Sequence, residues 1–326
     1  MENAWPAIAA CAGIISLLPV LARLRRGVRG TALESAWPCA AVVWVAWLAV
    51  ALLTIADRVS DHSSLHAWLD VLWYGTAILA LTPPVAVLGA RRPTARVWTI
   101  FVLIPLVLIF IWPVLPVMRT AGGPAAFSVE SPVLVGFILV LVMGAGNYLG
   151  LRFSPSALLW IAGLLLIVLT LCPATSEWVA GARMGRALGT LCVVASAWLA
   201  DRQAARAHAP GTPLDRVWRD FRDLFGIVWA RRIQERFNDE AAKQGMPLRL
   251  GFDGLEEADP VRCRSRAPTQ TALVPAESAD RRSPGPFDAR ALAAAETSLR
   301  WLLQKFVDRE WIDQRFNRSR ISVSSS

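Results

Sequence analysis

Two apolar runs joined by a short basic turn constrain this chain more than any other feature. The runs are Val71–Ala90 and Val97–Met118, and each has about the 20 residues that a helix needs to cross the hydrocarbon core of a bilayer. The turn between them holds Arg91, Arg92 and Arg96. Because short loops rich in Lys and Arg stay on the cytoplasmic side, the pair predicts a transmembrane hairpin whose turn lies inside.

Five further apolar runs continue the pattern, so the sequence predicts an all-α polytopic membrane protein with about seven transmembrane helices. The expected spans are residues 4–22, 36–56, 70–90, 97–118, 132–151, 156–175 and 183–200. With these spans, the arginines of the inside loops and of the first tail residues are Arg23, Arg25, Arg26, Arg29, Arg91, Arg92, Arg96, Arg152, Arg202 and Arg206. Those outside are only Arg58, Arg119, Arg183 and Arg186. The imbalance favours an N-terminus outside and a C-terminus inside.

The seventh span is the weakest of these predictions. Its uncharged part, Ala187–Ala200, has only 14 residues, a length that also suits an interfacial or re-entrant segment. Extension back to Arg183 gives 18 residues, and Arg183 and Arg186 are then expected to snorkel to the outer surface.

Prolines and glycines mark places where the predicted helices bend or approach one another. Kinks are expected near Pro83-Pro84 and at Pro105, because proline removes a backbone donor and clashes with the preceding turn. Small residues four apart allow close helix packing. Two such glycine pairs in the predicted spans are Gly146 with Gly150 and Gly185 with Gly189.

Charge is distributed unevenly along the chain. Of the 25 acidic residues, 7 lie before residue 201 and 18 at or after it, which separates an apolar block from a polar tail. The net charge of +9 is compatible with nucleic acid binding, but the tail carries 22 basic against 18 acidic residues, only +4. The remaining positive charge lies in predicted membrane loops, where it orients the spans and can contact anionic lipid. No nucleic acid partner is expected.

The tail opens with a long amphipathic helix, predicted from about Leu214 to Lys243. Trp218, Phe221 and Phe225 recur on its apolar face at spacings of three and four. This face has to be covered by the inner membrane surface, by the tail's own core or by a partner helix. Because the tail is short and interrupted, these three aromatic residues are the predicted partner-binding residues.

The tail divides into four predicted segments. Residues 201–261 hold the amphipathic helix and a short strand-and-turn segment, and residues 262–287 form a flexible linker rich in Pro, Ser, Ala and Arg. Residues 288–316 form a C-terminal amphipathic helix with Asp288 as its N-cap. Residues 317–326 are expected to be disordered.

A cluster of acidic residues and histidines in the predicted outside loop between the second and third spans is the only sequence pattern that resembles a metal site. Its core is Asp61, His62 and His66, and imidazole with carboxylate suits zinc or a similar divalent ion. The spacing matches no established metal-binding signature, so a solvated loop is the simpler interpretation. No cofactor is predicted.

The sequence disfavours several kinds of catalysis. No Asp, Glu, Lys, Arg or His lies at mid-depth in an apolar run, whereas proton-coupled transporters depend on such groups. The chain has no G-x-x-x-x-G-K-[ST], G-x-G-x-x-G or G-x-S-x-G motif. Enzyme activity is therefore not the leading interpretation.

The leading hypothesis is a non-catalytic membrane scaffold or sensor whose cytoplasmic amphipathic helices bind a partner or self-associate. Its expected surroundings are the lipid bilayer and a cytosolic protein or second copy of the chain, in a multi-pass protein of the bacterial inner (plasma) membrane. The alternative is a transporter or lipid-processing membrane enzyme, with a site between proline-kinked helices near Pro83-Pro84, Pro105 and Asn147.

Overall fold

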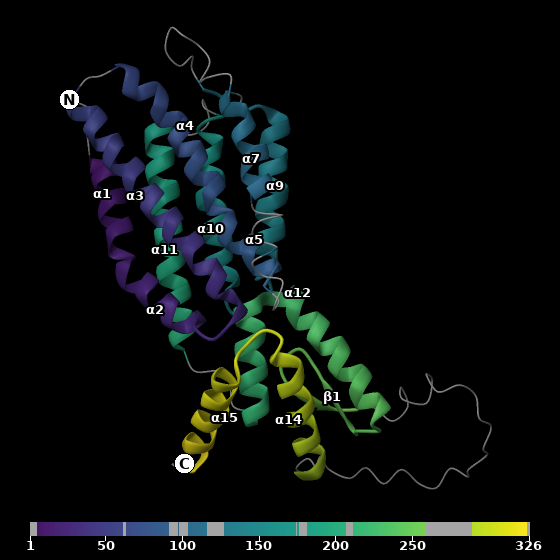
Figure 1. The fold of residues 1–326 in the computed structure, drawn as a ribbon. Helices are drawn as coiled ribbons and strands as arrows, with labels where there is room; N and C mark the ends of the chain where they lie inside the picture. The colour runs from purple at the N-terminus through teal and green to yellow at the C-terminus, as the bar shows by residue number, and fades with distance from the viewer. Residues whose placement is uncertain are drawn as a thin grey trace. The chain divides into compact units, whose positions relative to one another are not determined.

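The computed structural model is built almost entirely of helices, with one short β-hairpin in the part that it describes (Figure 1). It describes residues 5–60, 63–90, 97, 104–115, 127–173, 175, 181–206, 211–258 and 289–324, without the side chains of residues 58–67, 105, 109 and 317–324. The predicted linker, residues 262–287, and the predicted N-cap Asp288 lie outside the described residues.

The chain divides into two compact units. The bundle unit consists of Met1–Ala207 together with Phe225–Ile227, and the tail unit consists of His208–Leu224 and Val228–Ser326.

The bundle unit is a set of helices that run side by side (Figure 1). Its elements are α1 (Trp5–Ser16), α2 (Leu18–Val28), η1 (Ala32–Ser35), α3 (Ala36–Ser60), α4 (Ser63–Ala80), α5 (Thr82–Leu88), α7 (Ile104–Ile111), η3 (Trp112–Val114), α9 (Ser131–Gly146), α10 (Ser154–Leu169) and α11 (Ala182–Ala205). Helix α11 packs against α10 and α1, and α3 packs against α1 and α4. Helix α5 packs against α3 and α9.

Three stretches of the described chain are long and apolar enough to cross a membrane, namely Trp5–Val28, Ala32–Asp57 and Trp68–Leu88. Helices α9 and α10 are apolar but have only 16 residues each, shorter than the runs that the sequence suggests. Most of the predicted span 97–118 lies outside the described residues. Helix α11 is continuous over 24 residues and continues past the expected end at residue 200.

Two of the long apolar stretches contain a break at a proline. Helices α1 and α2 meet at Leu17, just before Pro19, and the indole Nε1 of Trp44 donates to the carbonyl oxygen of Ile14 at 2.8 Å beside this break. Helices α4 and α5 meet at Leu81, just before Pro83-Pro84. In an apolar environment, side-chain donors of this kind satisfy backbone groups that a broken helix leaves free.

A glycine contact brings α10 and α11 close together. A Cβ added at Gly163 would lie 2.6 Å from the carbonyl oxygen of Gly189, and one added at Gly189 would lie 2.6 Å from that of Gly163. Of the glycine pair expected to allow close packing, Gly185 and Gly189, Gly189 lies where α11 contacts α10. By contrast, a Cβ added at Gly146 would have no neighbour within 4 Å.

The tail unit is built around α12 (Pro213–Lys243), with β1 (Leu248–Leu250), β2 (Leu255–Glu257), α14 (Ala289–Leu303) and α15 (Arg309–Ser324). A capping box starts α12, because the Thr212 side chain accepts from the Asp215 backbone while the Asp215 carboxylate accepts from the Thr212 backbone. The strands pair antiparallel, with Leu248 opposite Glu257.

Helix α15 continues where the sequence suggests disorder. The predicted disordered end begins at Asn317, whereas the backbone of α15 remains helical to Ser324. The buried residues Trp311, Ile312 and Phe316 anchor the first turns of this helix, so the following residues extend a helix that has already been nucleated.

Candidate functional site

The three aromatic residues predicted to bind a partner are all buried. Trp218, Phe221 and Phe225 have exposed fractions of 1%, 0% and 0%. Phe225 belongs to the bundle unit, whereas Trp218 and Phe221 belong to the tail unit.

Trp218 and Phe221 form part of the tail unit's own core. Their rings stack with centroids 6.1 Å apart, and Phe221 meets Phe306 edge-on at 5.4 Å. The indole Nε1 of Trp218 donates to the carbonyl oxygens of Gly251 and Phe252, at 3.1 and 3.0 Å. Of the three coverings that the sequence allows for this face, the structure has the tail's own core around Trp218 and Phe221.

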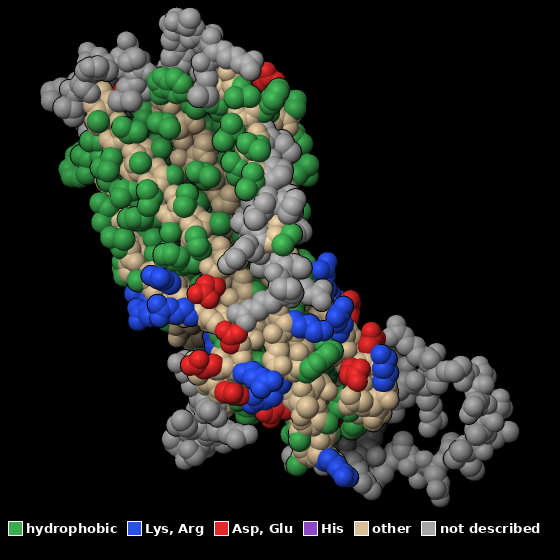
Figure 2. Space-filling model, in the orientation of Figure 1, with side chains coloured by type: hydrophobic (Ala, Val, Ile, Leu, Met, Phe, Trp, Pro, Cys, Tyr) green, Lys and Arg blue, Asp and Glu red, His purple; other side chains and the backbone are tan. Residues whose placement is uncertain are grey.

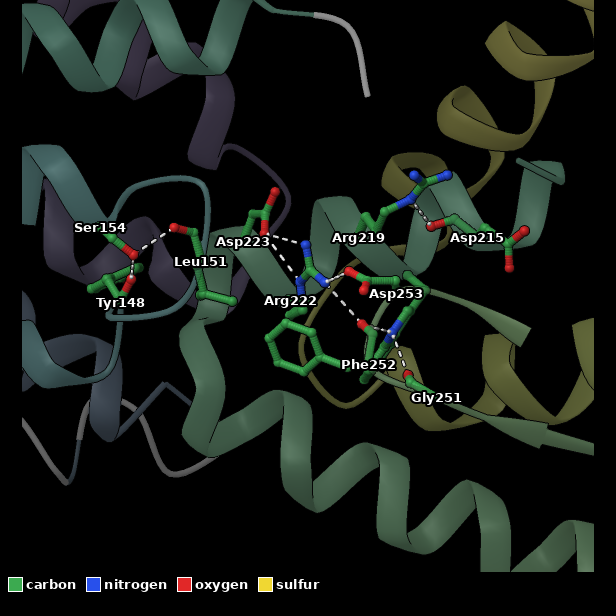
Figure 3. Close-up of polar contacts among 11 residues, drawn as sticks. Tyr148, Leu151, Ser154, Asp215, Arg219, Arg222, Asp223, Gly251, Phe252 and Asp253 are labelled. Atoms are coloured by element: carbon green, nitrogen blue, oxygen red, sulfur yellow. Dashed lines mark hydrogen bonds and ion pairs between the residues drawn. The ribbon is translucent and has the colours of Figure 1, made fainter. Parts of the chain in front are cut away.

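Arg222 is the centre of a buried polar cluster next to this core (Figure 3). Its Nε and Nη2 contact Asp223 Oδ1 at 3.2 and 3.1 Å, and its Nη1 donates to Asp253 Oδ1 at 2.7 Å. The same Nη1 donates to the Phe252 carbonyl oxygen at 2.8 Å, and the guanidinium carbon lies 4.5 Å from the centroid of the Phe252 ring.

The cluster joins α12 to the turn of the β-hairpin. The side chains of Arg222 and Asp223 are only 7% and 4% exposed, whereas Asp253 is 83% exposed. A buried guanidinium with carboxylate and carbonyl acceptors is neutralised and hydrogen-bonded, as a buried charge requires. The arrangement therefore fixes the turn. Within the described residues it contains no Ser, Cys or His that could act as a nucleophile or general base.

Asn147 is a second buried polar residue, and it lies in the bundle unit. The side-chain Nδ2 of Asn147 donates to the carbonyl oxygen of Phe225 at 3.1 Å, and the backbone carbonyl oxygen of Asn147 accepts from the backbone N–H of Ile227 at 2.9 Å. Gly226, which lies between Phe225 and Ile227, leaves the helical conformation with φ of 81°. A Cβ on Gly226 would lie 2.1 Å from Asn147 Nδ2, so the site admits only glycine.

An ion pair links three helices of the bundle unit. Nη2 of Arg186 on α11 lies 2.8 Å from Oδ1 of Asp70 on α4. Its Nε donates to Thr170 Oγ1, just after α10, at 3.2 Å. The sequence predicts that Arg186 snorkels towards the outer surface, but its side chain is 11% exposed and paired with Asp70. The opposite charges at the outer ends of two predicted spans are the signal that could have predicted the pair.

The predicted metal cluster falls outside what the structure describes. Asp61 and His62 are not among the described residues, and only the backbone of His66 is described. Among the described residues, no group of three His, Cys, Asp or Glu side chains could hold a metal ion.

Exposed apolar side chains are concentrated in the bundle unit, and Figure 2 shows its visible face largely covered by them. Among the described residues, the exposed large apolar side chains of the tail unit are Val228, Phe252 and Trp301. Trp301 is the most exposed of the three, at 59%, and Lys305 Nζ lies 4.2 Å from the centroid of its ring.

Comparison of the chain with protein-family models, with curated proteins and with solved structures finds no match. The fold alone therefore defines the class, which is a helical protein whose described residues include three stretches long and apolar enough to span a membrane.

Proposed function

We propose that this chain is a non-catalytic, multi-pass membrane scaffold or sensor with seven spans, its N-terminus outside and its tail in the cytoplasm of a bacterial cell. In this proposal the bundle unit lies in the inner membrane, and the tail unit binds a cytosolic partner or a second copy of the chain.

The proposal rests on one observation: among the described residues, most exposed large apolar side chains lie in the bundle unit and few lie in the tail unit. A water-exposed protein rarely leaves large contiguous apolar patches uncovered, whereas lipid covers them at no cost. The bundle unit exposes large apolar side chains along α1, α3, α7 and α9, for example Val45, Leu108 and Leu139. The tail unit instead buries most of its described aromatic residues, among them Trp218, Phe221 and Phe306, in a core of its own.

The outer face of α14 is the surface that best suits partner binding. Ala293, Thr297 and Trp301 are all exposed and follow one another at spacings of four, so they share one face of the helix. Two small side chains beside an exposed tryptophan allow another helix to approach closely while the indole supplies contact area. Trp218 and Phe221 would then act indirectly, by stabilising the unit that presents this face.

The test is the association state of the full-length protein in membranes, measured by chemical crosslinking and by mass determination in nanodiscs. Trp301→Glu is expected to reduce dimer or partner complex by tenfold or more, on the order of 1.4 kcal/mol or above for an interface tryptophan. Gln304→Glu adds the same charge at a neighbouring exposed position and serves as the matched control. A monomeric wild-type chain without a partner, or equal association of the two variants, would contradict the proposal.

The transporter or lipid-processing alternative needs a polar cavity between kinked helices. The described contacts give it less support. The Asn147 side chain is engaged by the Phe225 backbone, and a Cβ added at Gly144 would lie 3.1 Å from the Pro84 side chain, so α5 and α9 pack tightly there. Substrate-dependent labelling at Asn147 in the intact protein would support this alternative over the scaffold.

A further inference from the structure

The first long apolar stretch, Trp5–Val28, is longer than a bilayer core requires, and basic residues lie at its C-terminal end. Trp5–Val28 has 24 residues in the two consecutive helices α1 and α2, and at about 1.5 Å per residue this stretch is about 36 Å long. The hydrocarbon core of a bilayer is about 30 Å thick, so about four residues extend into the headgroup region. Arg25 and Arg26 lie in the last turn of α2, and Arg29 follows it.

Among the described residues, most of the positive charge at this end has no acidic partner. Arg23 forms a two-pronged ion pair with Asp201, with both nitrogen–oxygen distances at 2.8 Å. Arg25, Arg26 and Arg29 are exposed, and no carboxylate among the described residues pairs with them. Figure 2 shows Lys and Arg side chains gathered at one end of the apolar face of the bundle unit.

Tryptophans hold two of these arginines beside the apolar surface. The guanidinium carbon of Arg25 lies 4.8 Å from the ring centroid of Trp37, whose Nε1 donates to the Leu21 carbonyl oxygen at 3.3 Å. Arg23 lies 5.8 Å from the centroid of Trp198. Tryptophans concentrate at the headgroup level of membranes. Trp37 and Trp198 therefore agree with a position of the end of α2 in the headgroup region.

The exposed flank of α2 also has apolar side chains. Leu18 and Leu24 are 50% and 42% exposed on the same helix as the arginines. A surface with exposed leucines next to unpaired guanidinium groups matches an anionic lipid, which offers acyl chains and a phosphate together.

We propose that Arg25, Arg26 and Arg29 bind the phosphate groups of anionic phospholipids, in the leaflet that contains the end of α2. This inference rests on the proposed membrane function and adds the class of lipid that the protein selects. A planar guanidinium can donate two parallel hydrogen bonds to a phosphate, and each basic residue near an anionic leaflet contributes roughly fivefold to binding.

The experiment uses the full-length protein in mixed micelles with equimolar phosphatidylglycerol and phosphatidylcholine. Native mass spectrometry measures how many molecules of each lipid remain bound. The wild type is expected to retain phosphatidylglycerol preferentially, and the variant R25Q/R26Q/R29Q is expected to lose at least about tenfold of that preference. The control R231Q/R249Q/R309Q removes three exposed arginines from the tail unit and should keep it. Added salt should weaken the preference, and inorganic phosphate at millimolar concentration should not replace the lipid.

The variant R25K/R26K/R29K keeps the charge, so it should insert as the wild type does and retain most of the preference. Equal retention of the two lipids by the wild type would overturn the inference, as would equal losses in the R25Q/R26Q/R29Q variant and in its control. Displacement of the lipid by inorganic phosphate would overturn it as well. A wild-type chain that stays in the membrane after alkaline extraction but shows no lipid preference would refute this inference alone, whereas extraction of the chain would refute the membrane proposal itself.

Discussion

At the scale of single residues, Gly163 and Gly189 determine how closely α10 and α11 can pack. Gly189→Ala is expected to lower thermal stability, since its methyl group would meet the Gly163 backbone and Ile167, and overpacking costs about 1–3 kcal/mol. Gly75→Ala on α4 is the control, because its Cβ would have no neighbour within 4 Å and alanine favours a helix. Thermal unfolding of the purified protein in detergent measures both. Equal stability of the two variants would show that the helices do not cross at this contact.

The Asp70–Arg186 pair makes a second prediction at the same scale. Removal of either partner leaves a half-buried charge without its strongest hydrogen bond, so Asp70→Asn is expected to cost about 1–3 kcal/mol. Because the two residues contact each other, Asp70→Asn and Arg186→Gln together should cost less than the sum of the single changes. A double-mutant cycle in detergent measures this coupling. Strictly additive costs would mean that the pair does not form in the folded protein.

Sequence reasoning predicted which residues are apolar and on which helix face they lie, but not what covers them. The spacing of Trp218 and Phe221 identifies one face of α12, and a single sequence does not say whether a membrane, a partner or the chain itself packs there. The covering residue Phe306 is 85 positions away from Phe221 and lies beyond the predicted linker, residues 262–287. A contact at that separation depends on the tertiary fold, and local hydrophobic periodicity does not predict it.

At the scale of elements, the β-hairpin depends on α12 for its stability. The Asn238 side chain on α12 bonds both backbone groups of Leu250. Its Oδ1 accepts from the Leu250 N–H at 2.7 Å, and its Nδ2 donates to the Leu250 carbonyl oxygen at 3.1 Å. An isolated two-stranded hairpin is marginal in water, so these side-chain bonds fix it on the helix.

Asn238→Ala is therefore expected to expose the hairpin to solvent exchange. Loss of the two bonds leaves the Leu250 N–H to be satisfied by water, at a cost of about 1–3 kcal/mol, while the Leu250 carbonyl oxygen keeps the bond that it accepts from Gln234 Nε2. Hydrogen exchange followed by mass spectrometry should show faster exchange across Leu248–Glu257, while α15 remains protected. Gln244→Ala removes an exposed side-chain bond to Glu240 and should leave the hairpin unchanged. An unaltered exchange rate in Asn238→Ala would rule out this role.

Helix ends were less predictable than helix positions, for a reason visible in α2 and α11. Hydropathy places the end of a span where charge begins, at Arg23 and at Asp201. Both helices continue past these charges, to Val28 and Ala205, and Arg23 pairs with Asp201 across them. Backbone hydrogen bonding continues through charged residues whose side chains reach water or one another. The first charged residue therefore predicts where an apolar run ends, but not where its helix ends.

At the scale of the whole molecule, the side of the membrane that the proposed topology gives the tail depends on whether α11 crosses the bilayer. Its 24 residues give a length of about 36 Å, enough to cross a bilayer core of about 30 Å. Arg186 is neutralised by Asp70, which lowers the cost of placing it near the apolar layer. These two observations favour a helix that crosses the membrane over one that lies along its surface.

We therefore expect reporter fusions after Val179 and after Ala209 to report opposite sides, with Val179 outside and Ala209 in the cytoplasm. The two fusion points flank α11, so the comparison isolates this one helix from all preceding spans. Arg202→Glu and Arg206→Glu reverse the charge at its inner end, and together they should weaken this orientation if inside arginines set it. If both fusions report the outside, α11 does not cross, the tail faces outward, and its partner must be an extracytoplasmic one.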